Sequence, residues 1–196
     1  MVSDFLLTIG GKACQSVSKS TYGVINPATA QEIAQVPLGG STDVERAVSA
    51  ARAALPGWRY ITAKERAHYL WRLSTIVDAH RDKLARLETL DSGWPYRLVQ
   101  QHHINRCIDL LHYFAGAIDK FGGRVVPIDP DYLSYTFLEP HGVVALLVPW
   151  NAPLSNTFLG LAPALACGNT VILKPSYLTP LATLLLGKLL HETGFP

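Results

Sequence analysis

Two short apolar runs, each followed by a segment with helical spacing, make up the last quarter of the chain. The runs at 143–148 and 170–173 are too short for helices and rich in β-branched residues, which predicts strands buried on both faces. The helix between them is expected to end at Gly168, and a second helix to begin at Thr179-Pro180. Strand, helix, strand and helix in this order predict a right-handed βαβ unit of a parallel sheet.

Upstream of these runs, extended segments give way to long helical patterns. Residues 4–9 and 20–37 predict short strands, the latter forming a hairpin that turns at 26–29. Apolar positions then repeat at helical spacing, and the expected helices run from 41 to Pro56-Gly57, from 62 to 91, and from 96 to about 122. The candidate helix caps are Ser41 or Thr42, Thr62 with Glu65 in a capping box, Ser155 or Asn156, and Thr179.

Residues 124–141 differ from the helical segments before them. Their apolar positions alternate well enough to predict two strands around a turn at Pro130-Asp131. From the pattern alone, this hairpin is an ordinary surface feature.

Polar side chains mark the points where the two apolar runs end. Pro149, Trp150 and Asn151 follow the first run, and Lys174 follows the second. Ligands of open α/β sheets bind beyond the carboxyl ends of the strands, where an amide can donate to an oxyanion and an ammonium to a hydroxyl or phosphate. The G-x-G-x-x-G dinucleotide fingerprint is absent. The alternative interpretation is a core tryptophan and a solvated lysine at a strand end.

Four motifs resemble the aldehyde dehydrogenase family: VPWNAPL, APALACGNTVILKPS, LETLDSGWP and HYFAGAIDKFGG, with the similarity extending over 22–196. The resemblance implies NAD- or NADP-dependent oxidation of an aldehyde to a carboxylic acid through a thiohemiacetal and a thioester. It gives Asn151 the role of stabilising the aldehyde oxygen, and Lys174 that of binding the adenosine ribose. The implied cofactor-binding positions are Pro149, Trp150, Asn151, Lys174 and Ser176.

The same resemblance predicts an α/β fold that is an incomplete aldehyde dehydrogenase. Residues 1–123 are expected to form the amino-terminal strands and helices of the cofactor-binding domain, and 142–196 the first βαβα part of its Rossmann-like parallel sheet. Residues 124–141 are expected to project as a hairpin that pairs with a neighbouring subunit of a homo-oligomer. The catalytic domain is expected to be absent.

The chain departs from the family pattern at positions that carry chemistry. The catalytic cysteine and the general base of the family lie beyond Pro196, and Cys167 is interpreted as a packing residue. Tyr177 replaces a glutamate that binds the ribose in the family, so the choice between NAD and NADP stays open. Gly160 replaces a lysine of the family. The 196-residue chain alone is therefore predicted to be inactive. The alternative function is that of a non-catalytic truncated homologue that keeps only cofactor or assembly contacts.

Composition indicates which classes of partner and which cellular compartment are favoured. A formal net charge of +2 does not favour nucleic acid or an anionic membrane, and 48% apolar residues favour a globular chain. Three cysteines without C-x-x-C pairing and a start without the pattern of a signal peptide favour the cytoplasm. His102, His103 and His112 lack the spacing and the partner ligands of a metal site, so no metal is expected.

Overall fold

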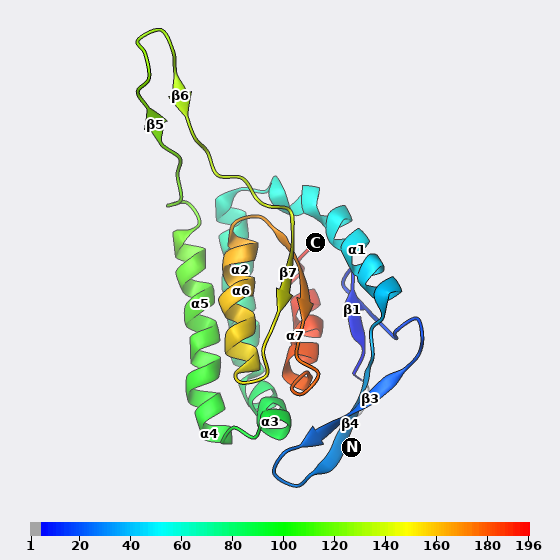
Figure 1. Cartoon of the computed structure of the whole chain (residues 1–196). Helices are drawn as coiled ribbons and strands as arrows, with labels where there is room; N and C mark the ends of the chain where they lie inside the picture. Colours follow the sequence, from blue (N-terminus) through cyan, green and yellow to red (C-terminus); the bar gives the residue numbers. More distant parts are fainter. Residues whose placement is uncertain (1–4) are drawn as a thin grey trace.

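The computed structural model describes residues 5–196 and shows an α/β fold (Figure 1). Strands β7 (Val143–Leu147) and β8 (Thr170–Lys174) pair in parallel, with Leu147 opposite Lys174. Helix α6 (Pro153–Ala166) connects them, and α7 (Leu181–Glu192) follows β8. The parallel pair and its crossover helix confirm the predicted βαβ unit.

The parallel pair is covered unequally on its two faces. Gly160 of α6 lies against Leu146 of β7, and this approach closes one face. Ala145 and Leu147, which alternate with Leu146 along the strand, are exposed on the other. The prediction of strands buried on both faces is therefore wrong, because α6 covers only one of them.

Two antiparallel hairpins precede the helices. β1 (Leu7–Ile9) pairs with β2 (Lys12–Cys14), and β3 (Thr21–Asn26) pairs with β4 (Gln31–Pro37). The second hairpin turns between Asn26 and Gln31, as predicted, and the Asn26 side chain accepts from the N–H of Ala28 at 2.9 Å. Residue 4 of the first expected strand lies outside the described residues.

Helices α1 (Ser41–Arg59), α2 (Ala63–Ala79) and α3 (Arg81–Ser92) differ in part from their predicted bounds. Thr62 and Glu65 form the expected capping box. Gly40, rather than Ser41 or Thr42, occupies the N-cap of α1, and Asp43 accepts from the Gly40 N–H at 3.1 Å. Pro56 lies inside α1 instead of ending it, and the expected second helix is divided at His80.

The third predicted helix is continuous but not uniform. It consists of α4 (Tyr96–Leu98), a π-helical turn η1 (Val99–His103) and α5 (Ile104–Ala117). A π turn inserts an extra residue into the helix and shifts the helical face that follows it. Spacing alone does not reveal such a shift.

The predicted hairpin at 124–141 projects from the body of the molecule (Figure 1). Its strands are shorter than the segment suggests, β5 (Val125–Val126) and β6 (Ser134–Tyr135). Most of its large apolar side chains are exposed, including Val125, Leu133, Phe137 and Leu138.

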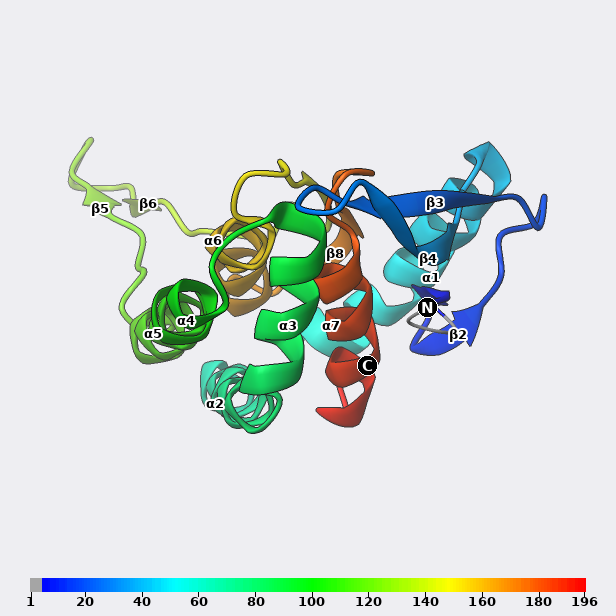
Figure 2. The ribbon, with the colours of Figure 1, turned by 90° about the horizontal axis from the view of Figure 1, so that it is seen from below.

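The main core lies between α2, α5, α6 and α7, with Trp58 of α1 and Phe158 of α6 among its largest buried side chains (Figure 2). Among the described residues, no helix combines the length and apolar character needed to cross a membrane.

Candidate functional site

The two strands end at the same edge of the parallel pair. The N–H of Val148 donates to the carbonyl of Lys174 at 3.0 Å, which extends the pairing to the last residue of β8. We call residues 148–152 the first loop and residues 175–180 the second loop. The Thr179 hydroxyl in the second loop donates to the Trp150 carbonyl in the first loop at 3.3 Å. The predicted meeting of these two segments at one sheet edge is therefore present.

Asn151 lies at the end of the first loop with an exposed side chain. Its Oδ1 accepts from Nδ2 of Asn156 at 3.2 Å, and its main-chain carbonyl accepts from Nε1 of Trp94 at 2.6 Å. Within residues 5–196, no acceptor is bound to Nδ2 of Asn151. The carboxamide is thus held through its oxygen, and its two N–H bonds remain available to an anionic or carbonyl oxygen.

Lys174 is exposed at the end of β8. Its ammonium donates to the carbonyl of the neighbouring Pro175 at 3.3 Å, and no salt bridge joins it to a carboxylate in the described part of the chain. Trp150 is 57% exposed, so the interpretation of this residue as core is wrong. An ammonium without a carboxylate partner and an exposed indole at adjoining strand ends suit a nucleotide, whose hydroxyl and phosphate oxygens accept hydrogen bonds and whose base stacks.

The remaining predicted cofactor positions also lie in the two loops. Pro149 is exposed in the first loop. In the second loop, the Ser176 hydroxyl accepts from the N–H of Leu178 at 3.2 Å, which closes a local turn. Tyr177 is exposed beside Ser176 and supplies no carboxylate at the position where a ribose-binding acid was expected.

Two buried carboxylates of α3 lie against the helices that follow the loops. Oε2 of Glu88 accepts from the N–H of Leu154 at 3.2 Å, and Oδ2 of Asp91 accepts from the N–H of Leu181 at 2.9 Å. Oε1 of Glu88 also pairs with Nδ1 of His103. Burial raises the pKa of Asp91 to about 8, against the lowering effect of the Leu181 hydrogen bond. The sequence interpretation missed both acids, although acids three residues apart among buried leucines are an available signal of internal partners.

None of the three cysteines belongs to the two loops. Cys167 caps the C-terminal end of α6 and is exposed, so its interpretation as a packing residue is wrong. Since α6 has 14 residues, Cys167 lies about 20 Å from the Asn151 end of that helix. Cys107 is buried, and burial together with the Glu88 charge raises the pKa of its thiol well above the usual value. Cys14 is half-buried in β2.

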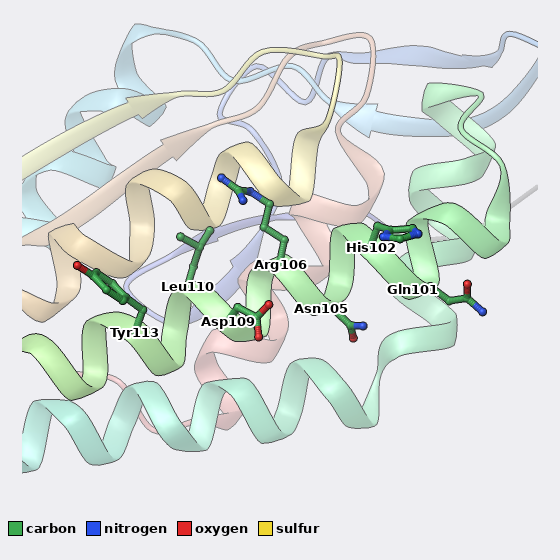
Figure 3. A pocket seen from close by; sticks show the side chains of 7 residues that line it. All are labelled: Gln101, His102, Asn105, Arg106, Asp109, Leu110 and Tyr113. Atoms are coloured by element: carbon green, nitrogen blue, oxygen red, sulfur yellow. The ribbon is translucent and has the colours of Figure 1, made fainter.

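A separate hollow of about 500 Å³ follows one face of η1 and α5 (Figure 3). Figure 3 shows Arg106 reaching toward α6, with Asp109 one turn further along. The hollow is lined by Gln101, His102, Asn105, Arg106, Asp109, Leu110 and Tyr113. None of the residues predicted to bind cofactor lines it.

No group of three or more His, Cys, Asp or Glu side chains that could hold a metal ion occurs within residues 5–196. The polar groups at the strand ends include the Asn151 amide, the Lys174 ammonium, the Ser176 and Thr179 hydroxyls and main-chain groups of the two loops.

Comparison with known proteins shows the family to which the chain belongs. The family model described as "Aldehyde dehydrogenase family" matches residues 14–196. The chain belongs to this family. It is 44% identical to the mitochondrial aldehyde dehydrogenase of Equus caballus over 184 residues, covering 92% of this chain and 37% of that protein. It is 40% identical to the cytosolic aldehyde dehydrogenase 1 of Elephantulus edwardii over 193 residues, covering 97% of this chain and 38% of that protein.

Solved structures agree on the family fold. An NAD⁺ complex of the aldehyde dehydrogenase from Bacillus cereus superposes with a TM-score of 0.96 at 38% identity, covering 99% of this chain and 40% of that one. The chain thus spans about two-fifths of the length of the aldehyde dehydrogenases it matches.

Proposed function

We propose that the two loops form the nicotinamide cofactor site of an aldehyde dehydrogenase, and that the parent reaction is oxidation of an aldehyde to a carboxylic acid. The observation that carries this proposal is the meeting of Asn151 and Lys174 at one edge of the parallel pair in a member of that family. The NAD⁺-bound relative from Bacillus cereus supports the choice of cofactor class.

Each residue of the site has a role that follows from its contacts. Lys174 offers the ribose hydroxyls or a 2′-phosphate an ammonium that makes no salt bridge among the described residues. Pro149, Trp150 and Ser176 line the same edge and provide main-chain and hydroxyl contacts. When bound, NAD⁺ or NADP⁺ supplies the hydride acceptor.

Asn151 is proposed to act on the aldehyde oxygen. Asn156 holds its carboxamide by the oxygen, which leaves its N–H bonds without a partner among residues 5–196. A donor fixed in this way stabilises the negative charge that develops on a carbonyl oxygen during nucleophilic attack, and it needs no reorganisation when the charge appears.

The first prediction concerns Lys174. Lys174→Ala is expected to weaken cofactor binding by about 1.5 to 3 kcal/mol, the range of a hydrogen bond to a charged group, because Tyr177 offers no carboxylate to share the ribose. Calorimetric titration of NAD⁺ and NADP⁺ measures the change. Lys188→Ala, which removes an exposed lysine of α7, is the matched control and should bind like the unmodified chain. Equal dissociation constants for the Lys174 variant and the control would remove Lys174 from the site.

The second prediction concerns turnover. The 196-residue chain is expected to produce no NADH or NADPH with any aldehyde, because the two loops contain no cysteine and Cys167 lies at the far end of α6. Absorbance at the wavelength of reduced nicotinamide follows the reaction. Turnover that disappears in Cys167→Ala would identify Cys167 as a nucleophile after all, and turnover that survives would require a different nucleophile.

A non-catalytic homologue that retains cofactor or assembly contacts is the second candidate. The favouring observation is Gly160, where a Cβ atom would lie 2.9 Å from Cδ2 of Leu146. Any larger residue here, including the lysine expected from the family resemblance, requires Leu146 to move. Cofactor binding without turnover in a longer natural form of the chain would favour this candidate.

We further propose that residues 124–141 pair with a second copy of the chain. Exposed apolar side chains on a projecting two-stranded hairpin suit strand or surface pairing between copies. The third prediction is therefore that Leu133→Lys, at a position 78% exposed, reduces self-association in light scattering. Val44→Lys is the control on an exposed position of α1. Equal scattering of both variants and the unmodified chain would contradict this assembly.

The cytoplasm is the compartment that we propose for this chain. The three cysteines of the described residues are unpaired, as is usual in a reducing compartment. Both mitochondrial and cytosolic aldehyde dehydrogenases are among the similar proteins.

A further inference from the structure

The C-terminal end of α3 makes side-chain hydrogen bonds to both segments of the site. Glu88 accepts from Leu154 and Asp91 accepts from Leu181, which are early residues of α6 and α7. Trp94, just beyond α3, donates to the carbonyl of Asn151 itself at 2.6 Å. We call Glu88, Asp91 and Trp94 the α3 brace.

The spacing of the α3 brace explains how one element reaches two loops. Glu88 and Asp91 are three residues apart, so they lie on one helical face, and Trp94 follows the helix end at Gly93. Figure 2 shows α3 beside α7, with α6 on its other flank. The first loop ends at the N-terminus of α6 and the second at that of α7, so the brace meets each loop where it joins its helix.

The carboxylates replace local caps. Neither α6 nor α7 has a side-chain hydrogen bond from its own N-cap residue, Ala152 or Pro180. The first N–H groups of a helix need acceptors, which a carboxyl oxygen supplies. Here the acceptors come from α3, 66 residues before Leu154 and 90 before Leu181.

The two carboxyl groups are buried. Glu88 is 0% exposed and Asp91 is 4% exposed, and Oδ1 of Asp91 has no hydrogen-bond partner within the described residues. Burial of this kind is costly, and a local Ser or Asp at each helix start would satisfy the same N–H groups more cheaply. A local cap would not tie these helix starts to another element. The acceptors on α3 do, and they therefore fix the end of each loop relative to α3.

We infer that Glu88, Asp91 and Trp94 are positioning residues. They set the relative placement of the first and second loops, and so of Asn151 and Lys174, for the cofactor. This inference rests on the proposed function of those loops. The brace acts through the main chain of the loops and touches neither cofactor nor substrate. Trp94 fixes the carbonyl of Asn151, and Asp91 fixes the start of α7 behind the second loop.

Hydrogen exchange of the 196-residue chain, read by mass spectrometry on peptides spanning 148–160 and 175–185, tests the inference. Trp94→Phe keeps an aromatic ring and removes the indole N–H donor. It should increase the exchange rate of the first loop about two- to ten-fold and leave that of the second loop unchanged. Trp71→Phe is the control, because Trp71 is a half-exposed tryptophan of α2.

Asp91 allows a rescue experiment. Asp91→Ala should increase exchange at the start of α7 by a similar factor, and Asp91→Asn, which keeps an acceptor oxygen, should restore most of the protection. Asp82→Ala is the control on the exposed part of α3. An equal increase across α1, α2 and both loops in all variants would show general destabilisation and would overturn the inference.

Cofactor titration separates this inference from the proposed function. If the unmodified chain binds NAD⁺, Trp94→Phe and Asp91→Ala should raise the dissociation constant about two- to ten-fold and Asp91→Asn should not. If the unmodified chain does not bind NAD⁺ but the local exchange changes occur, the proposed function fails and the placement of the loops by α3 stands. Binding that is unaffected by all three variants, with unchanged local exchange, would overturn the inference alone.

Discussion

Trp58→Ala is expected to lower the free energy of unfolding by about 3 to 5 kcal/mol, the usual loss for a large aromatic side chain removed from a core. Trp58 is 1% exposed, and its ring lies 5.4 Å from that of Tyr69 and 5.1 Å from that of Phe195. Its Nε1 donates to the carbonyl of Leu165 at 3.1 Å. One side chain thus joins α1, α2, α6 and the end of the chain.

Urea unfolding followed by circular dichroism measures this loss. Trp71→Ala is the matched control, because Trp71 is 47% exposed and its replacement is expected to cost about 1 kcal/mol or less. Equal losses for the two tryptophans would contradict the assignment of Trp58 to the centre of the core.

The second large effect concerns the pH dependence of stability. Burial raises the pKa of Asp91 to about 8 in the folded chain, whereas an unfolded aspartate titrates near 4. Between these values the folded chain holds a proton that the unfolded chain has released. Stability from this group is therefore complete below about pH 4 and is lost as the pH rises to about 8, at up to about 1.4 kcal/mol per pH unit.

Asp91→Asn should remove this slope and so become more stable relative to the unmodified chain as the pH rises. Urea unfolding at closely spaced pH values from 4 to 9 gives both curves. Asp82→Asn serves as the control, because Asp82 is exposed and hydrogen bonds from Gln100 and Tyr96 lower its pKa. Parallel curves for the Asp91 variant and the unmodified chain would mean that Asp91 stays ionised in the fold.

Local sequence patterns were sufficient to predict much of the fold. The β-branched runs at 143–148 and 170–173 became a parallel pair, and the turn at 26–29 became a hairpin, because strand length, branching and turn chemistry are set by neighbouring residues. The capping box at Thr62 formed for the same reason. These features need no knowledge of the rest of the chain.

Features set by distant partners were missed or misplaced. Helix α6 begins at Pro153 instead of after Ser155, because the carboxylate of Glu88 supplies the acceptor that a local cap would provide. Helix α1 continues past Pro56, where burial of Trp58 fixes its last turn against the core. The exposed outer face of the parallel pair also depends on what packs against it, which strand patterns do not reveal.

The candidate site divides in the same way. The positions of Asn151 and Lys174 could be predicted because Asn151 lies in the loop after β7 and Lys174 is the last residue of β8, and parallel strands bring such ends together. The partners of Glu88 and Asp91 could not be predicted. Their spacing among leucines indicates internal partners, but the N–H groups from which they accept lie 66 and 90 residues away. Cys167 was misjudged because the end of an apolar helix suggested burial.

The central claim is that the strand ends at Leu147 and Lys174 form the cofactor site. Its most direct test is hydrogen exchange of the 196-residue chain with and without saturating NAD⁺, read on peptides that cover the whole sequence. Protection confined to residues 148–152 and 174–180, and lost in Lys174→Ala, is the expected result. Protection along residues 101–113, which line the hollow on η1 and α5, would contradict the claim, and so would the absence of protection at both loops.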